Sequence, residues 1–249
     1  MTYNLAVSPD FKPELISDWF IFNTWIQKQI GISVHLELHH DFNEQYAAID
    51  AKKVDLIYAN SYDISRLVRD EGFTVIAKPH QKPDETVIAC KLEAGFDNVK
   101  SLSTPVSIAQ TCSPDVNTIG MIMLEPADIT IENIKKIACA NYVGVAKQLL
   151  KGEADIGFFL EDAFNDLSPL IRKQLKPVVS SQIHLIHHAF LVGPAVNEHI
   201  DAIRSSLLSM HEDKSGALIL AGLGFSAWDP MRQDDAEFII DLIDTLVCE

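Results

Sequence analysis

Apolar and polar positions alternate along the chain in two periods, one typical of strands and the other of helices. Tyr3, Leu5 and Val7 alternate with polar or small residues, which predicts a first strand. In the next segment the apolar positions repeat about every 3.6 residues. Together with Pro13 near the first turn and Gly31 at the end, they predict a helix.

The same alternation continues to the end of the chain. It predicts strands at 34–36, 54–59, 73–77, 85–91, 105–109, 135–138 and 156–160, and an extended segment at 183–192. It predicts helices at 46–51, 64–68, 117–124, 142–151, and about 197–210, 215–222 and 234–247. Because strands and helices follow each other in turn, we expect parallel βαβ units and an α/β fold.

One short pattern occurs twice. Residues 53–58 (KVDLIY) and 153–158 (EADIGF) each follow a predicted amphipathic helix and open an apolar strand. The repeat predicts two lobes of related architecture, with chance similarity at a helix-to-strand turn as the alternative. We expect lobe 1 to comprise 1–82 and 186–249, and lobe 2 to comprise 83–185. Crossings near 80–86 and 181–188 would form a hinge, with a ligand at strand ends in the interlobe cleft.

Composition and charge narrow the range of possible functions. The 249 residues include 47% hydrophobic ones, enough for real cores, and carry a net charge of −15. An acidic surface repels phosphate backbones, so we expect no nucleic-acid partner. No run reaches the roughly 18 apolar residues of a membrane helix, so we expect no membrane insertion. The first strand begins without a basic or apolar leader, which leaves a cytoplasmic location or a trimmed signal open.

Known catalytic and cofactor motifs are not found in the sequence. It has no G-x-S-x-G elbow and no phosphate-binding or dinucleotide glycine loop, and we expect no cofactor. The four cysteines, Cys90, Cys112, Cys139 and Cys248, form no CxxC pair. Histidines cluster at 39–40 and at 184, 187 and 188. Adjacent strand residues point to opposite faces, so we favour polar cleft residues over a metal site.

Several motifs in order along the chain point to one family. They are Asp41-Phe42, residues 53–58, Asn117-Thr118-Ile119-Gly120, residues 150–155 with Glu161-Asp162, residues 187–190, and residues 222–225 with Asp229. In these motifs the chain resembles the type II periplasmic solute-binding proteins of ABC importers for phosphate, phosphite and phosphonate, as a divergent member. The resemblance implies two lobes, each a mixed, mostly parallel sheet flanked by helices, joined by a hinge. It also implies a periplasmic monomer that delivers a small solute to an ABC permease.

The resemblance implies an oxyanion site at the turn 117–120. The family has a Ser-Thr-Ser-Gly turn at a helix start, where backbone amides and the helix dipole favour an anion. In this sequence Thr118 keeps a hydroxyl, Asn117 can still donate, and Ile119 cannot. Asn117 could equally cap the helix. We therefore interpret the anion site as degraded or retuned, and expect an anionic or polar ligand other than phosphonate.

The other candidate ligand-binding residues come from both lobes. From lobe 1 we expect Phe42, Tyr58, Asn60 and Ser61; from lobe 2, Asn117, Thr118, Ile119, Gly120, Tyr142 and Asp162; and His187 at the second crossing. Asn60 or Ser61 could also cap the next helix. Asp84 stands where the family has an aromatic residue at the first crossing. Some relatives sense arsenite through a cleft thiol, but we favour a structural thiol for Cys112.

Two alternatives stay open. Some cytosolic enzymes of menaquinone and thiamin-precursor synthesis use the same fold, and carboxylates and histidines in a closed cleft could do acid–base work. Because the motifs of those enzymes are not found here, we expect a protein without catalytic activity. The second alternative is a ligand-sensing domain that reports to a sensor kinase.

Overall fold

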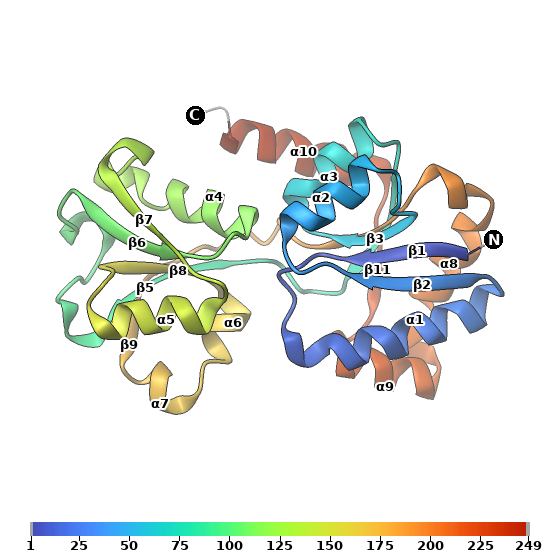
Figure 1. Cartoon of the computed structure of the whole chain (residues 1–249), viewed down its shortest axis with the longest axis horizontal. Coiled ribbons are helices and arrows are strands. Elements are labelled where there is room, and N and C mark those ends of the chain that lie inside the picture. The colour runs from blue at the N-terminus through green and yellow to red at the C-terminus, as the bar shows by residue number, and fades with distance from the viewer. Residues whose placement is uncertain (1, 248–249) are drawn as a thin grey trace. The chain divides into compact units, whose positions relative to one another are not determined.

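The computed structural model describes residues 2–247 and divides into two compact units. The first unit contains residues 2–82 and 187–245, and the second contains 83–186. Each unit has one mixed sheet covered by helices (Figure 1). The predicted α/β architecture, with a helix-flanked mixed sheet in each of two lobes, is confirmed.

The sheet of the first unit has six strands in the order β11-β4-β10-β3-β1-β2. Strand β1 pairs in parallel with its two neighbours, β2 and β3. Strand β10 is antiparallel to β3 and β4, and β11 is antiparallel to β4. The carboxyl ends of β1, β2, β3 and β4 therefore meet at one edge, where β10 begins. The bounds are β1 Thr2–Val7, β2 Ser33–Leu38, β3 Leu56–Ala59, β4 Thr74–Pro79, β10 Ala189–Val192 and β11 Trp228–Pro230.

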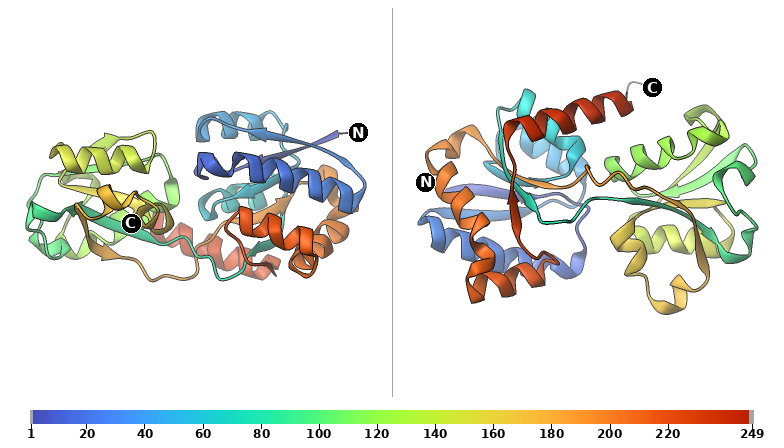
Figure 2. Two further views of the ribbon diagram at one scale, coloured as in Figure 1. Left: turned by 90° about the horizontal axis from the view of Figure 1, so that it is seen from below. Right: turned by 180° about the vertical axis from the view of Figure 1, so that it is seen from behind.

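Helices cover both faces of this sheet. Helices α2 (Phe42–Asp50) and α3 (Ser61–Arg69) lie on one face (Figure 1). Helices α1 (Ile16–Ile30), α8 (Ile200–Leu208) and α9 (Lys214–Gly222) pack together on the other (Figure 2). Trp19, Phe22 and Ile26 recur at helical spacing in α1 and are buried in this core. Helix α1 ends at Gly31, whose φ of 70° suits glycine. Helix α10 (Gln233–Val247) closes the described chain.

The second unit has five strands in the order β7-β6-β8-β5-β9. Helix α4 (Pro114–Ile122) contacts β5 and β8, and α5 (Tyr142–Lys151) contacts β6 and β8 from the opposite face. Alternate residues of β5 enter two apolar clusters: Val87 and Ala89 lie on the α5 side, Ile88 and Cys90 on the α4 side. The remaining bounds are β5 Thr86–Lys91, β6 Val106–Gln110, β7 Ile134–Ala138, β8 Ile156–Leu160, β9 Leu175–Ser180, α6 Glu161–Asn165 and α7 Pro169–Arg172.

Short 3-10 turns complete the structure. They are Pro13–Leu15, Leu92–Ala94, Val99–Ser101, Glu125–Ala127, Ile131–Asn133, Pro194–His199 and Met210–Glu212.

The two sheets are built alike. The strand order β2-β1-β3-β10-β4 of the first unit corresponds to β7-β6-β8-β5-β9 of the second. The repeated sequence pattern lies at the same place in both: Asp55 precedes β3 and Asp155 precedes β8. Residues 51–59 and 151–159 also share one succession of exposed and buried positions. The repeat therefore has a structural role, which favours related architecture over chance similarity.

Several sequence-based assignments need correction. Residues 183–188 form no strand, and β10 begins only at Ala189, because polar groups of neighbouring segments take up several of the preceding backbone groups. Strand β9 was not predicted because Pro177 interrupts it; proline is tolerated there because β9 is an edge strand. Helix α4 begins at Pro114 and not at Asn117. Cys248 lies outside the described residues.

Candidate functional site

Polar residues gather at the carboxyl edge of the first sheet. Ser8 and Asp10 follow β1, Asn60 and Ser61 follow β3, and two histidines precede antiparallel β10 at the same edge. Because helices that follow parallel strands begin at this edge, the amino ends of α2 and α3 also lie there. The edge thus combines side-chain donors and acceptors with the positive ends of helix dipoles.

An ion pair between Asp10 and His188 lies in this group. Nε2 of His188 is 3.2 Å from Oδ1 of Asp10, and its ring stacks on Tyr58 with centroids 5.0 Å apart. Burial raises the pKa of Asp10, but attraction to His188 and hydrogen bonds from His188 and Ser8 outweigh it, so the pKa is lowered overall. Asp10 is therefore a buried carboxylate that is held in its charged form by contacts with His188 and Ser8.

A second carboxyl group, Asp63, is buried close by. Nε2 of Gln45 donates to Asp63 at 3.1 Å, and the Asp63 amide donates to the capping side chain of Asn60. Burial raises the pKa of Asp63 to about 7, against a lowering hydrogen bond from Tyr46, and the charge of Asp10 raises it further. Asp63 therefore changes protonation near neutral pH.

The predicted site residues Asn60 and Ser61 are fully buried and have structural partners. Asn60 caps α3. The Ser61 hydroxyl donates to the carbonyl of His187 at 2.7 Å and accepts from its amide at 3.0 Å. The structure thus brings Ser61 and His187 together and fixes the chain where it re-enters the first unit.

The predicted aromatic residues of the first unit are largely buried. Phe42 is the first residue of α2 and packs near the ring of Tyr46. Tyr58 lies on β3 among Trp19, Phe225 and Trp228. Each keeps only 6–7% of its surface exposed, so both rings mainly pack the core at this edge.

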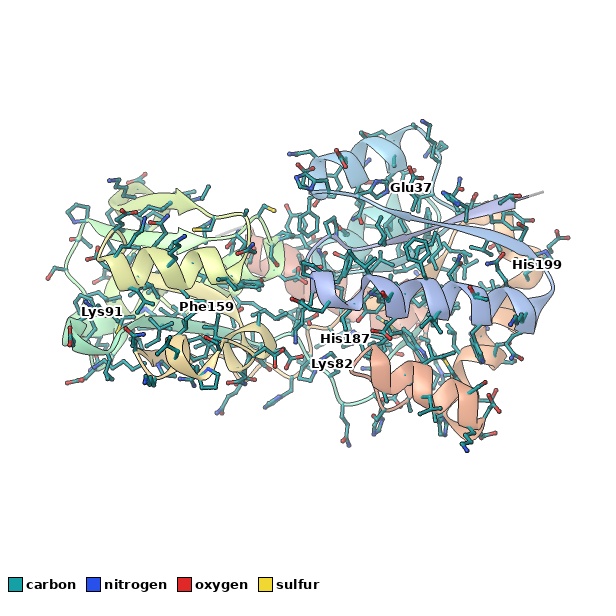
Figure 3. All side chains as sticks on the ribbon, turned by 60° about the horizontal axis from the view of Figure 1, so that its bottom comes forward. Glu37, Lys82, Lys91, Phe159, His187 and His199 are labelled. Atoms are coloured by element: carbon teal, nitrogen blue, oxygen red, sulfur yellow. The ribbon has the colours of Figure 1, made fainter. Side chains whose placement is uncertain are left out.

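The two adjacent histidines contact different partners. His187 lies at the end of the returning segment (Figure 3), with its Nε2 3.2 Å from Nζ of Lys78. His188 contacts Asp10 instead. The separation agrees with the expectation that neighbouring side chains in extended backbone point in opposite directions.

The turn 117–120 in the second unit does not begin a helix. Ser113 precedes the helix and Pro114 occupies its first position, as its missing N–H and fixed φ favour. Asn117 lies one turn further on, and its amide donates to the carbonyl of Ser113 at 3.2 Å. The predictions that Asn117 caps the helix, and that amides from 117 onward are exposed, are therefore wrong.

The residues of the turn 117–120 differ in burial and in hydrogen bonding. Nδ2 of Asn117 donates to the carbonyl of Thr111 at 2.9 Å. Ile119 is buried, and a side chain at Gly120 would collide with the Phe158 ring at 2.6 Å. Thr118 is half-buried and carries the one hydroxyl of the turn.

Tyr142 and Asp162 lie on different helices of the second unit. Tyr142 opens α5 and stacks near Phe159 with centroids 6.1 Å apart. Asp162 is exposed in the first turn of α6, directly after β8. Both helices begin at the carboxyl edge of the second sheet, as α4 does. The second unit therefore repeats the edge construction of the first.

Buried carboxyl groups occur where the chain enters the second unit. Glu85 accepts from the amides of Ile183 at 3.1 Å and His184 at 2.6 Å, and from the Ser181 hydroxyl. The amide of Asp84 donates to Ile186 at 2.7 Å. These bonds explain why polar residues occupy the returning segment without forming a strand.

Sequence reasoning missed Asp10, Asp63, Lys78 and Glu85. Asp10 had a usable signal, because Ser8-Pro9-Asp10 directly follows the first strand. Asp63 and Glu85 look like ordinary surface carboxylates in the sequence, since only tertiary packing buries them.

Among residues 2–247, none of the helices combines the length and apolar character needed to cross a membrane. Within that range, no three or more His, Cys, Asp or Glu side chains gather as they would around a metal ion. Cys112 lies exposed in the loop between β6 and α4.

One family model matches most of the sequence. The family model described as "ABC transporter, phosphonate, periplasmic substrate-binding protein" matches residues 5–236. None of the curated proteins compared matches the sequence.

Solved structures share the fold. PhnD1 from Prochlorococcus marinus in complex with methylphosphonate has a TM-score of 0.83 and 14% identity, covering 98% of both chains. A binding protein component of an ABC phosphonate transporter from Pseudomonas aeruginosa has a TM-score of 0.81 and 14% identity, covering 98% of this chain and 86% of that one. The periplasmic aliphatic sulphonate-binding protein SsuA from Escherichia coli has a TM-score of 0.65 and 11% identity, covering 98% and 87%.

Proposed function

Because the chain belongs to the family of periplasmic substrate-binding proteins of phosphonate ABC transporters, we propose that it captures a small anionic or polar solute and delivers it to an ABC permease. Members of this family are substrate-binding components and not enzymes, and the proposal contains no catalytic step. We place the protein in the periplasm as a monomer.

One observation carries the proposal: both units present the same construction at the carboxyl edge of their sheets. Helices α2 and α3 begin at one edge and α4, α5 and α6 at the other. Amino ends of helices favour anionic groups, and ligands of open α/β sheets bind outside the carboxyl ends of the strands. We propose that Phe42, Tyr58 and His187 of the first unit, and Thr118, Tyr142 and Asp162 of the second, contact the solute.

The proposed solute is not a simple phosphonate. The turn 117–120 lies inside α4, its Asn117 amide is bonded to Ser113, and Ile119 is buried. Thr118 alone offers a hydroxyl there, which is a sparse donor set for a phosphonate group. Calorimetry with methylphosphonate and 2-aminoethylphosphonate tests this, and micromolar binding of either compound would contradict it.

The solute itself can be identified by native mass spectrometry of freshly purified protein, followed by extraction. We expect Thr118→Val to weaken its binding by about tenfold, equivalent to about 1.4 kcal/mol. Thr24→Val, an exposed change on α1, is the matched control. Unchanged affinity in Thr118→Val would show that Thr118 lies outside the binding site.

A further inference from the structure

Lys78 carries a part-buried ammonium group near the end of β4. Its Nζ lies 3.2 Å from Nε2 of His187, and no ion pair joins it to a carboxylate among residues 2–247. Partial burial of a cation without an anionic partner is unfavourable, because lost hydration is not compensated. Such a group calls for an anion from outside the chain.

The acidic residue opposite Lys78 on the neighbouring strand contacts a histidine instead. Asp229 on β11 stands opposite Lys78 in the β4–β11 register. Its two carboxylate oxygens lie 2.9 and 3.0 Å from Nδ1 of His80, however. Asp10, at the same sheet edge, pairs with His188. Neither of these acids therefore forms an ion pair with Lys78.

His187 holds the ammonium in place. Its Nε2 can accept from Lys78 when the ring is neutral, and its Nδ1 lies 3.3 Å from the carbonyl of His188. Its backbone N–H and carbonyl are both bonded to the Ser61 hydroxyl. Because an ammonium has three N–H donors and His187 takes one, two remain for another acceptor.

We propose that Lys78 binds an oxyanion group of the solute, such as a carboxylate, sulfonate or phosphate, and that His187 is its positioning residue. The inference rests on the proposed function and names the residue that supplies the countercharge. It places this charge on the first unit, beside the returning segment, and not at the turn 117–120 of the second.

The test compares Lys78→Gln and Lys78→Arg with wild-type protein, with Lys136→Gln as control. Lys136 is an exposed lysine on β7 of the second unit, so its substitution makes the same charge change in the other unit. Thermal unfolding is measured with sodium phosphate, methanesulfonate or acetate at fixed ionic strength balanced with sodium chloride. We expect at least one oxyanion to stabilise wild-type protein saturably, and Lys78→Gln to weaken this binding by about tenfold.

Lys78→Arg keeps the charge and is expected to retain much of the binding, and Lys136→Gln all of it. Without added anion, Lys78→Gln should be at least as stable as wild-type protein, because it removes a part-buried charge that has no ion-pair partner. Loss of stability in that variant would indicate a merely structural lysine and would overturn the proposal. Equal anion binding by Lys78→Gln and wild-type protein would overturn it too, as would the lack of any saturable response in wild-type protein.

Native mass spectrometry separates this inference from the proposed function. If wild-type protein and Lys78→Gln retain the same solute equally, the role of Lys78 is wrong while solute binding stands. If wild-type protein retains no solute and binds no oxyanion, both proposals fail.

Discussion

Asp155 and Ser107 are joined by reciprocal hydrogen bonds: the Asp155 carboxylate accepts the Ser107 amide at 2.8 Å, and the Asp155 amide donates to the Ser107 carbonyl at 3.0 Å. Asp55 and Asn4 are joined in the same way, at 2.8 and 2.9 Å. Each aspartate fixes the start of a buried strand against its parallel neighbour. It thereby helps to set the register of its sheet.

Replacing this carboxylate should destabilise the second unit. We expect Asp155→Ala to lower the free energy of unfolding by about 1–3 kcal/mol, because the Ser107 amide loses its charged acceptor. Urea unfolding followed by circular dichroism measures the change. Glu153→Ala, two residues earlier with 55% of its side chain exposed, should have almost no effect. Equal effects of the two changes would contradict a register role for Asp155.

Gly120 and Gly144 should respond oppositely to alanine, although both lie in helices. A methyl group at Gly120 would come within 2.6 Å of the Phe158 ring, whereas at Gly144 the nearest atom is 3.4 Å away. We expect Gly120→Ala to cost about 1–3 kcal/mol through overpacking. Gly144→Ala should stabilise by up to about 1 kcal/mol through helix propensity. Thermal unfolding of both variants checks the contrast, and a stabilised Gly120→Ala protein would refute it.

Asp63 should make stability fall as the pH rises toward neutrality. Its pKa is raised from 3.8 to about 7 in the folded protein, so the folded state binds the proton more tightly than the unfolded chain. The stabilisation is complete below pH 3.8 and is lost as the pH rises through about 7. The lowered pKa of Asp10 affects the free energy of unfolding only in more acidic solution, where this carboxylate becomes protonated.

Asp63→Asn isolates this contribution, because the amide stays neutral and its oxygen can still accept from Gln45. Between pH 4 and 7.5, wild-type protein should lose on the order of a few kcal/mol relative to the variant. Melting curves across that range measure the difference. Parallel pH profiles for the two proteins would mean that Asp63 does not titrate there.

Glu85 should hold the returning segment 181–184 in place. Gln would keep the shape, but its single amide oxygen can accept from only one of the N–H groups of Ile183 and His184, while its NH2 group faces the other. At least one of the two bonds would therefore be lost. We expect Glu85→Gln to speed hydrogen exchange of at least one of these amides and to cost about 1–3 kcal/mol. Glu93→Gln, with its side chain 82% exposed, is the control. Unchanged exchange at Ile183 and His184 would show that another contact fixes the segment.

Local sequence patterns predicted the helices and strands in which buried residues recur at a regular spacing. The helix 142–151 and the strand 156–160 match α5 and β8 residue for residue, because apolar periodicity, the Asn141 cap and Gly152 all agree there. The start of α4 was readable from Ser113-Pro114 but was assigned to the family turn instead. Strand β9 was not predicted because it contains Pro177, which a strand tolerates only at the edge of a sheet.

The polar edge was less predictable than the sheets. Asn60 and Ser61 were readable as residues between a strand and a helix, but their partners were not. His187 is 126 residues from Ser61 in sequence, and Lys78 is 109 residues from His187. No local pattern encodes such pairings, since they arise only when distant segments meet at one sheet edge.

The place of β10 in the first sheet has a consequence for synthesis on the ribosome. Strand β10 lies between β3 and β4, yet its residues 189–192 are made more than a hundred positions after those strands. In the nascent chain, β3 and β4 therefore lack the strand that joins them until β10 has been made. By then the second unit, which is continuous in sequence from 83 to 186, has already emerged. The middle of the polypeptide can thus complete its core before the beginning does.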